Sequence, residues 1–369
     1  MLHLSKIKPA FSLLTLLLLA TVSCTSSKTI QYENVPIQRA QIELTEEQLL
    51  DVGILIFDPN LPEEDQEFIF PEIRKAEARY IPYHLKTTLE DTGFWGGVWV
   101  LPEKSEAMDL IVWGRIEVSN GLKVAVRIGV WDITGREWMN KVYETTVSRS
   151  AYSQQRDYSQ DPYQSFYNKI ANDLLKIRNS LSSPELRRIS EIGDLRFAAE
   201  LVPGVYSDYL MQDEKDIFSA KRLPSENDAM MGRIQNVKER EFVLVDTLNE
   251  YYAKLYQDIS VPYENWRKLS REEMLTYEDL GFCEKGAAKE HIKAGTFALD
   301  GELPVNTDGG LKTFGHPTGA TGVRMLYENT LQLQGRAGER QVSGATMALS
   351  HNIGGAPQTC GMAVVGIDR

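Results

Sequence analysis

Two histidines in glycine-rich stretches near the C-terminus are the residues whose types and spacing fit acid–base chemistry. His316 stands between Gly315 and Pro317, and His351 follows further along, just before another pair of glycines. Glycine lets backbone amides approach a ligand closely, and a residue that precedes proline is biased away from helix. We therefore predict that both imidazoles are presented on exposed loops, where a general acid or base reaches its substrate.

The elements that must position these histidines are predicted from the spacing of apolar residues. Helical and strand patterns alternate here: a short helix within residues 274–286, a helix at 321–334 that Gly335 ends, and strands at 345–350 and 360–367. The His316 loop lies between the two helices, and the His351 loop lies between the two strands. Residues 274–369 are thus expected to form an α/β (half) domain.

An α+β domain is expected over residues 25–185. Its strand patterns recur at short intervals, at residues 52–57, 98–101, 110–118, 122–131 and 137–147. The dipeptide Asn120-Gly121 predicts a hairpin between two of them. Amphipathic helices at residues 70–89 and 162–181 are expected to cover the sheet, and Pro82 is expected to break or kink the first.

Tryptophan is concentrated in this β-rich stretch, which holds Trp95, Trp99, Trp113, Trp131 and Trp138. One interpretation is an aromatic platform that binds a ligand or glycan. Packing in the core and across strands explains the same pattern and is favoured, because large aromatic side chains commonly fill both positions.

Residues 186–273 are predicted to form a helical segment without catalytic groups. Its clearest pattern is a charged amphipathic helix at residues 237–256, and Pro262 together with the charged run at residues 266–273 is expected to close the segment. Four charged residues of that helix are interpreted as a solvated face rather than a carboxylate pair for acid–base work: Glu241, Asp246, Glu250 and Lys254.

Net charge and cysteine spacing exclude two classes of site. The formal net charge is −12 and no concentrated basic stretch is present, so no nucleic-acid partner is expected. The three cysteines Cys24, Cys283 and Cys360 lie far apart, which argues against a metal site and against a disulfide framework. Cys360 opens an apolar strand and is expected to be a buried small hydrophobe, and Cys283 is expected to be inert.

The N-terminus has the pattern of a secretory signal. Lys6 and Lys8 precede an apolar run at residues 10–20 that is too short for a membrane span. The run leads to Thr21-Val-Ser-Cys24, which resembles a bacterial lipobox with Thr21 where leucine is preferred. Residues 1–24 are therefore predicted to be a lipoprotein signal peptide, with Cys24 as the lipidated N-terminus in the bacterial cell envelope. An uncleaved anchor and an ordinary secretory signal remain alternatives.

Four motifs follow one another in the C-terminal region. They are YEDLGFCEKG at residues 277–286, LPVNTDGG at 303–310, GHPTGATG at 315–322 and HNIGG at 351–355. On these residues the region resembles the C-terminal portion of a thiolase of the lipid-transfer-protein (sterol-carrier) branch, over about a quarter of the chain. The resemblance implies acyl transfer with a coenzyme A thioester as substrate and no separate cofactor. Residues 25–185 loosely resemble the α+β module of some bacterial envelope lipoproteins.

The thiolase resemblance also implies roles for single residues. His316 would activate a nucleophilic cysteine and help to stabilise the thioester oxyanion, and His351 would serve acid–base work at the substrate α-carbon. Asn306 and Gly319 would shape the loop, and Gly315 would let its backbone approach an anionic intermediate or the pantetheine of coenzyme A.

The resemblance does not extend to the nucleophile. The family carries its acyl-accepting cysteine in an N-terminal half, and no residue before Met274 offers an equivalent. A lipid anchor would also place the chain outside the cytoplasm, where the thiolase segment alone would be found with its acyl-CoA substrates. We therefore expect a fusion of a membrane-anchored lipoprotein with an incomplete thiolase domain that is inactive alone. The alternative is a non-enzymatic envelope lipoprotein with a structural or binding role.

Overall fold

The computed structural model describes residues 34–42, 44–61, 71–121, 123–146, 161–225, 227–284, 286–317, 319–354 and 359–367. The predicted signal peptide and Cys24 lie outside these residues. Within the described ranges, no helix combines the length and the apolar composition that crossing a membrane requires.

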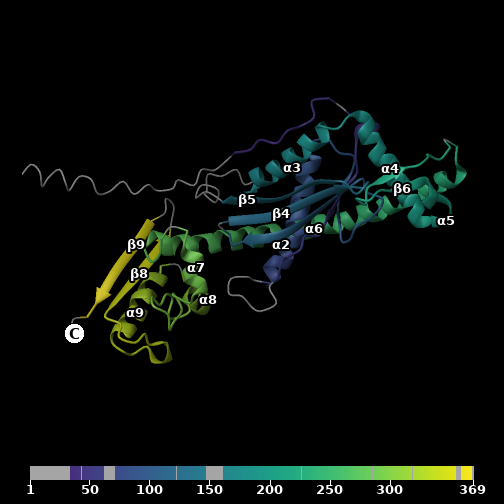
Figure 1. The fold of residues 1–369 in the computed structure, drawn as a ribbon. Coiled ribbons are helices and arrows are strands. Elements are labelled where there is room, and N and C mark those ends of the chain that lie inside the picture. Colours follow the sequence, from purple (N-terminus) through teal and green to yellow (C-terminus); the bar gives the residue numbers. More distant parts are fainter. Residues whose placement is uncertain are drawn as a thin grey trace, which may run out of the picture.

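A five-stranded mixed sheet forms the centre of the N-terminal region, in the order β2-β1-β3-β4-β5 (Figure 1). The strands are β1 (Val52–Leu55), β2 (Val98–Leu101), β3 (Leu110–Ser119), β4 (Lys123–Asp132) and β5 (Glu137–Thr146). β1 pairs in parallel with β2 and β3, whereas β3, β4 and β5 form an antiparallel meander. The predicted hairpin is confirmed, and Gly121 in its turn has a φ of +77°, which favours glycine.

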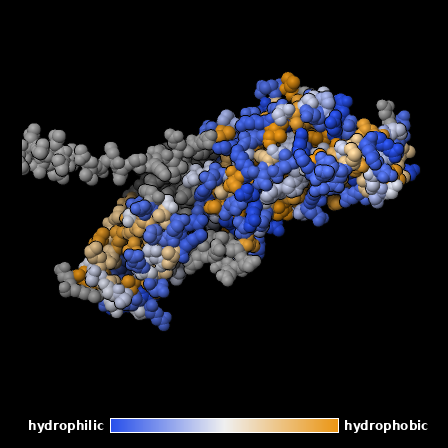
Figure 2. Space-filling view, viewed as in Figure 1, coloured by the Kyte–Doolittle hydropathy of each residue, from blue (hydrophilic) through white to orange (hydrophobic). Residues whose placement is uncertain are grey.

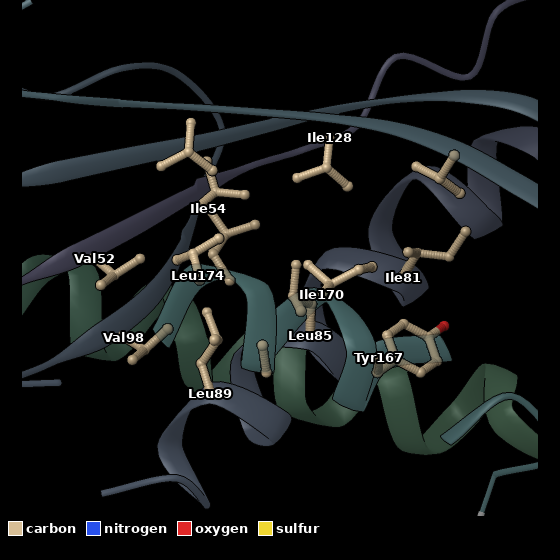
Figure 3. Packing of buried hydrophobic residues seen from close by; sticks show 14 of the residues in the cluster. Val52, Ile54, Ile81, Leu85, Leu89, Val98, Ile128, Tyr167, Ile170 and Leu174 are labelled. Atoms are coloured by element: carbon tan, nitrogen blue, oxygen red, sulfur yellow. The ribbon is translucent and has the colours of Figure 1, made fainter. Parts of the chain in front are cut away.

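Helices α2 (Pro71–Glu90) and α3 (Gln164–Asn179) cover one face of this sheet. Figure 3 shows apolar side chains of the strands facing those of the two helices; they include Val52, Ile54, Ile128, Ile81, Leu85, Leu89, Ile170 and Leu174. Each of these eight is at most 2% exposed. Full burial of one such side chain contributes about 1.5–3 kcal/mol, so this layer is the main source of stability in the region.

Pro82 was predicted to break or kink its helix. It lies inside α2 and the helix is continuous through it, so a break is wrong. Proline removes the N–H that the carbonyl four residues earlier would accept. That carbonyl, on Ala78, accepts a hydrogen bond from the backbone N–H of Phe57 at 2.9 Å instead. The segment that follows β1 therefore compensates for the proline.

Helices α4 (Ser183–Leu201) and α6 (Ala229–Asp279) cover the opposite face around β2 and the start of β3. Asn249 of α6 accepts from the backbone N–H of Val100 at 2.8 Å and donates to its carbonyl at 3.1 Å. This side chain takes the place of a neighbouring strand and protects the edge of β2. Asp246, Glu250 and Lys254 are exposed as predicted, and Asp246 also accepts from the indole N–H of Trp99. Glu241 is half-buried and accepts from the Ser105 hydroxyl, so the solvated-face prediction is wrong for this residue.

Helix α6 does not end at Pro262, and the separate short helix expected from residue 274 is its last part. Tertiary contacts just beyond the proline hold the chain helical. Tyr263 is buried and its hydroxyl donates to Glu77 of α2 at 2.8 Å, and Arg267 is 1% exposed in an ion pair with Asp161. Local propensity predicted a stop here, but these buried contacts outweigh it.

Packing rather than ligand binding accounts for the tryptophans that are buried or covered by a neighbouring residue. Trp95 and Trp138 are buried, which confirms that interpretation for them. Trp99 stacks on Phe242 of α6, with ring centroids 5.0 Å apart. The indole of Trp113 lies across Gly129 of the neighbouring strand, where a Cβ atom would come within 2.2 Å of it.

The remaining elements are short or lie in the C-terminal region. They are η1 (Glu46–Gln48), α5 (Pro203–Tyr206), η3 (Ser207–Tyr209), β6 (Leu210–Gln212), β7 (Phe218–Ala220), α7 (Ala288–Lys293), α8 (Gly310–Phe314), α9 (Thr321–Leu333), η4 (Gly338–Arg340), β8 (Met347–Gly354) and β9 (Thr359–Gly366). The β6–β7 hairpin had not been predicted. The β8–β9 hairpin packs beside α9 at the opposite end of α6 from β6 (Figure 1).

Candidate active site

His316 lies on the exposed loop between α8 and α9, as predicted. Gly315 and Gly319 flank it with φ of +76° and +84°, a conformation that glycine adopts without strain. Its Nδ1 lies 2.8 Å from Oγ1 of Thr321, a buried side chain in the first turn of α9. The ring is therefore anchored through Nδ1 to the helix terminus, and Nε2 is the nitrogen left for a substrate.

The turn at Asn306 is tied to the same helix. Asn306 has a φ of +54°, and its carbonyl accepts from the N–H of Gly309 at 2.8 Å. Asp308 accepts from the N–H of Gly310 at 2.9 Å and forms an ion pair with Arg324 of α9 at 3.0 Å. Thus α9 positions both the Asn306 turn and the His316 loop.

Charged groups further along α9 fix its position. Glu328 forms an ion pair with Arg340 at 3.0 Å and accepts from Thr307 at 3.1 Å and Gln332 at 3.0 Å. Partial burial raises the pKa of Glu328, but the hydrogen bonds from these partners and the charge of Arg340 outweigh it, so the net shift is downward. The carboxylate is therefore structural, because its partners are Arg340, Thr307 and Gln332.

His351 lies in strand β8 rather than on a loop, which corrects the prediction for this residue. Pairing with β9 continues from His351 opposite Met362 to Gly354 opposite Thr359, so residues 351–354 belong to the strand. A Cβ at Gly322 of α9 would come within 2.9 Å of the Asn352 side chain, so Asn352 faces α9. Alternation along the strand then puts His351 on the outward face of the hairpin.

The two histidine segments thus meet at the first turn of α9, but their imidazoles are not brought together. Thr321 holds His316, and the next residue, Gly322, contacts the neighbour of His351. Chemistry that used both rings would need a substrate reaching from the helix terminus to the outward face of the hairpin.

The two described cysteines lie apart from the His316 anchor. Cys360 is exposed at the start of β9, so its predicted burial is wrong; the strand is apolar, but this face of the hairpin is open. Cys283 is half-buried and packs against a small cluster that includes Tyr277 and Phe297. Nδ1 of His316 has the Thr321 hydroxyl as its partner and not a thiol.

A cluster of metal ligands or a cavity elsewhere would point to a different catalytic site. In the described part of the chain, no group of three or more His, Cys, Asp or Glu side chains is placed to hold a metal ion. A cavity of 470 Å³ lies beside α4 and the β6–β7 hairpin, and neither histidine lines it. Arg196 at its wall is already engaged, because it donates to the Ile133 carbonyl at 2.6 Å and stacks on Phe218.

Sequence reasoning missed the residues that support the loop: Thr321, Asp308 and Arg324. Thr321 was predicted to begin a helix, which is where a hydroxyl next to a loop histidine serves as an anchor. Asp308 stands in an Asn-Thr-Asp-Gly-Gly sequence, a turn signal in which an aspartate commonly bonds the backbone two residues on. The Asp308–Arg324 pair depends on the path of the loop and had no local signal.

Comparisons with known proteins concern the same region. Residues 268–367 match a family described as thiolase C-terminal domain-like. The acetyl-CoA acetyltransferase of Methanothermobacter thermautotrophicus is 51% identical over 82 residues, which are 22% of this chain and 21% of that protein. Human sterol carrier protein 2 is 46% identical over 85 residues, 23% of this chain and 16% of that protein. Benzoylsuccinyl-CoA thiolase subunit BbsB of Thauera aromatica is 32% identical over 84 residues, 22% of each chain.

The C-terminal region is therefore a thiolase C-terminal domain-like segment. The chain spans about a fifth of the length of the curated relatives that it matches.

Proposed function

We propose that residues 268–367 supply the histidine part of a thiolase-type acyltransferase site that acts on coenzyme A thioesters. The observation that carries the proposal is the Nδ1 anchor of His316 on Thr321, within a segment 51% identical to an acetyl-CoA acetyltransferase. A histidine fixed through one nitrogen presents the other in a defined direction, which general acid–base catalysis requires.

His316 has two tasks in this proposal. As a base, its Nε2 takes the proton of a nucleophilic thiol while the thiolate attacks the thioester carbonyl carbon. As the C–S bond breaks, the same nitrogen returns the proton to the departing coenzyme A sulfur. The exposed loop at Gly315 and Gly319 leaves room for the pantetheine arm, and the N-terminus of α9 favours the negative charge that develops on the carbonyl oxygen.

The nucleophilic thiol is proposed to come from another polypeptide, so the chain alone is inactive. Cys283 packs in an apolar cluster, and Cys360 lies on the outward face of β9. His351, on that same outward face, is proposed as the second acid–base group at the substrate α-carbon. Asn306 shapes the adjoining turn through its positive φ.

The test is thiolysis of acetoacetyl-CoA by the full chain mixed with a thiolase polypeptide that carries the nucleophile but lacks the segment homologous to residues 268–367. Turnover is expected only in the mixture. His316→Ala is expected to lower it about 100-fold or more. His291→Ala, which removes a histidine of α7 outside the proposed site, serves as the matched control and should keep the wild-type rate. Equal rates for all three proteins would overturn the assignment of His316.

We also propose that the chain is anchored to the bacterial cell envelope by lipid on Cys24. The Lys6 and Lys8 pair, the short apolar run and the cysteine at its end support this. A non-enzymatic binding or structural role for the N-terminal region is the second candidate function, favoured by its separate core. Incorporation of labelled palmitate into the wild-type chain but not into Cys24→Ala tests the anchor, and equal labelling of both would overturn it.

A further inference from the structure

The outward face of the β8–β9 hairpin is apolar and open to solvent. Met347, Met362 and Val364 are 72%, 57% and 65% exposed, and Leu349 shares their face through the strand alternation. Figure 2 shows the apolar patch over this hairpin. Residues 345–367 contain no Asp, Glu, Lys or Arg. Edges and open faces of sheets normally carry such charges to prevent unwanted pairing, so this face has the composition of a covered surface.

The rest of the C-terminal region repeats this pattern. On α9, Val323, Leu326 and Tyr327 are exposed, and on α8, Phe314 is exposed. Among the residues that the structure describes, the buried hydrophobic cluster here contains Tyr277, Ala288, Ile292 and Phe297, and Leu333 and Ala337 are buried apart from it. A core of this size gives a hairpin and three helices little stability, because the apolar area buried has to offset the conformational entropy of every ordered residue.

We propose that the outward face of the β8–β9 hairpin, formed by Met347, Leu349, Met362 and Val364, docks a second polypeptide that carries the remainder of a thiolase-type subunit. The inference rests on the proposed function and names the partner of that site. The relatives argue for this occupant: a segment 51% identical to this one accounts for only 21% of the acetyl-CoA acetyltransferase. In such a protein, most of the chain is available to cover the surface that is open here.

The hairpin also offers a place for further strands. Among the described residues, β8 and β9 pair only with each other, so each has an outer edge with unpaired backbone groups. A partner strand added to either edge would extend the sheet and bring its apolar side chains over the exposed face. His351 and Cys360 lie on that face, so the partner would sit next to the second proposed acid–base group.

Binding is tested with a defined probe, the Methanothermobacter acetyl-CoA acetyltransferase without its segment homologous to residues 268–367. The full chain and the probe are co-expressed, and the affinity of the purified proteins is measured by titration calorimetry. We expect a complex with a Kd of about 1 μM or tighter. Placing two lysines on the face, Met362→Lys with Val364→Lys, should weaken it about tenfold or more. The matched pair Val205→Lys with Met211→Lys, at exposed apolar positions of α5 and β6, should bind like the wild type.

Alkylation of Cys360 gives a second measurement that needs no variant. Its exposed thiol should react with a maleimide about tenfold more slowly in the complex than in the chain alone, because docking covers it. Three outcomes overturn the proposal: no complex with a probe that circular dichroism shows to be folded, equal affinity of the face variant and the wild type, or a stable dimer of this chain alone that the two lysines abolish.

The outcomes separate docking from catalysis. His316→Ala should bind the probe like the wild type, since the loop is not on the docking face. A complex that forms but shows no thiolysis keeps the docking surface and overturns the proposed function. Thiolysis that the two face lysines leave unchanged keeps the function and overturns the docking surface.

Discussion

The N-terminal sheet region and the C-terminal histidine region differ in how they hold themselves together. In the first, α2, α3 and five strands enclose a continuous core, and the edge of β2 is closed by Asn249 of α6. In the second, the buried cluster among the described residues is small, with Tyr277 and Phe297 at its centre, and the β8–β9 hairpin leaves one face open. The recognisable chemistry therefore lies in the region that buries the least apolar surface. A recognisable motif and a stable domain are separate properties, and each has to be tested by itself.

The two regions also differ in how deeply their ion pairs are buried. The N-terminal region buries the Arg267–Asp161 pair, with the Arg267 guanidinium 4.4 Å from the ring centroid of Tyr263. Burial raises the pKa of Asp161, but the charges of Arg267 and His84 outweigh it and hold the pKa well below its usual range. In the C-terminal region, the pairs around α9 stay partly solvated. Loss of a charge should thus cost far more in the first region.

The largest expected effect comes from Arg267→Ala. It leaves Asp161 as an uncompensated buried charge, which costs about 3–5 kcal/mol of unfolding free energy. The matched control is Arg39→Ala, which breaks the exposed, solvent-screened pair with Asp91 and should leave the free energy of unfolding nearly unchanged. Urea denaturation followed by tryptophan fluorescence measures both, since every tryptophan of the chain precedes residue 268. Similar costs for the two variants would contradict the account of this helix anchor.

The next largest difference is expected from truncating an apolar side chain, which should lower the free energy of unfolding much more in the N-terminal region than in the C-terminal one. Ile54→Ala removes a fully buried side chain from the centre of the sheet and should cost about 2–5 kcal/mol. Val364→Ala removes an exposed one from β9 and should change the free energy of unfolding by less than about 0.5 kcal/mol in the chain alone. Denaturation monitored by hydrogen exchange in both regions makes the comparison. A large cost for Val364→Ala would show that the hairpin face is already covered in the isolated chain.

A smaller effect depends on pH and involves Asp109, a buried carboxyl facing Asp51, Asp194 of α4 and Lys238 of α6. Burial raises the pKa of Asp109 to about 7. The unfolded carboxyl loses its proton near pH 4, whereas the folded one keeps it to about pH 7. This group's contribution to the free energy of unfolding therefore falls as pH rises between these values, by up to about 1.4 kcal/mol per pH unit.

Asp109→Asn removes that titration and should leave a shallower decline of stability between pH 5 and pH 7. The measurement is the difference in unfolding free energy between variant and wild type at several pH values. A difference that stays constant from pH 5 to pH 8 would contradict the raised pKa.

Local patterns predicted most elements, and long-range contacts explain the failures. Asn120-Gly121 carries its own turn geometry, so the hairpin was predictable. Pro82 was predicted to break or kink its helix and Pro262 to help close the helical segment. Both helices continue, because the Phe57 N–H bonds the freed Ala78 carbonyl and Tyr263 is buried against α2. These partners lie far away in sequence and leave no local trace.

In the candidate site too, the features set by local sequence were predicted and those set by long-range contacts were not. The His316 loop follows from Gly315, Pro317 and Gly319, which set the backbone locally, and the structure places it on an exposed loop. His351 was expected on a loop because glycines follow it, but the register with β9 extends the strand through it. The Thr321 anchor was not predicted, because a hydrogen bond between a loop and a helix terminus depends on how the loop folds back.

Thiolysis of acetoacetyl-CoA tests the central claim most directly, measured for the chain alone, for the mixture with the truncated acetyl-CoA acetyltransferase, and for that mixture with His316→Ala. The account predicts no turnover by the chain alone, turnover in the mixture, and a loss of about 100-fold or more with His316→Ala. Turnover by the chain alone, or turnover in the mixture that His316→Ala leaves unchanged, would contradict it.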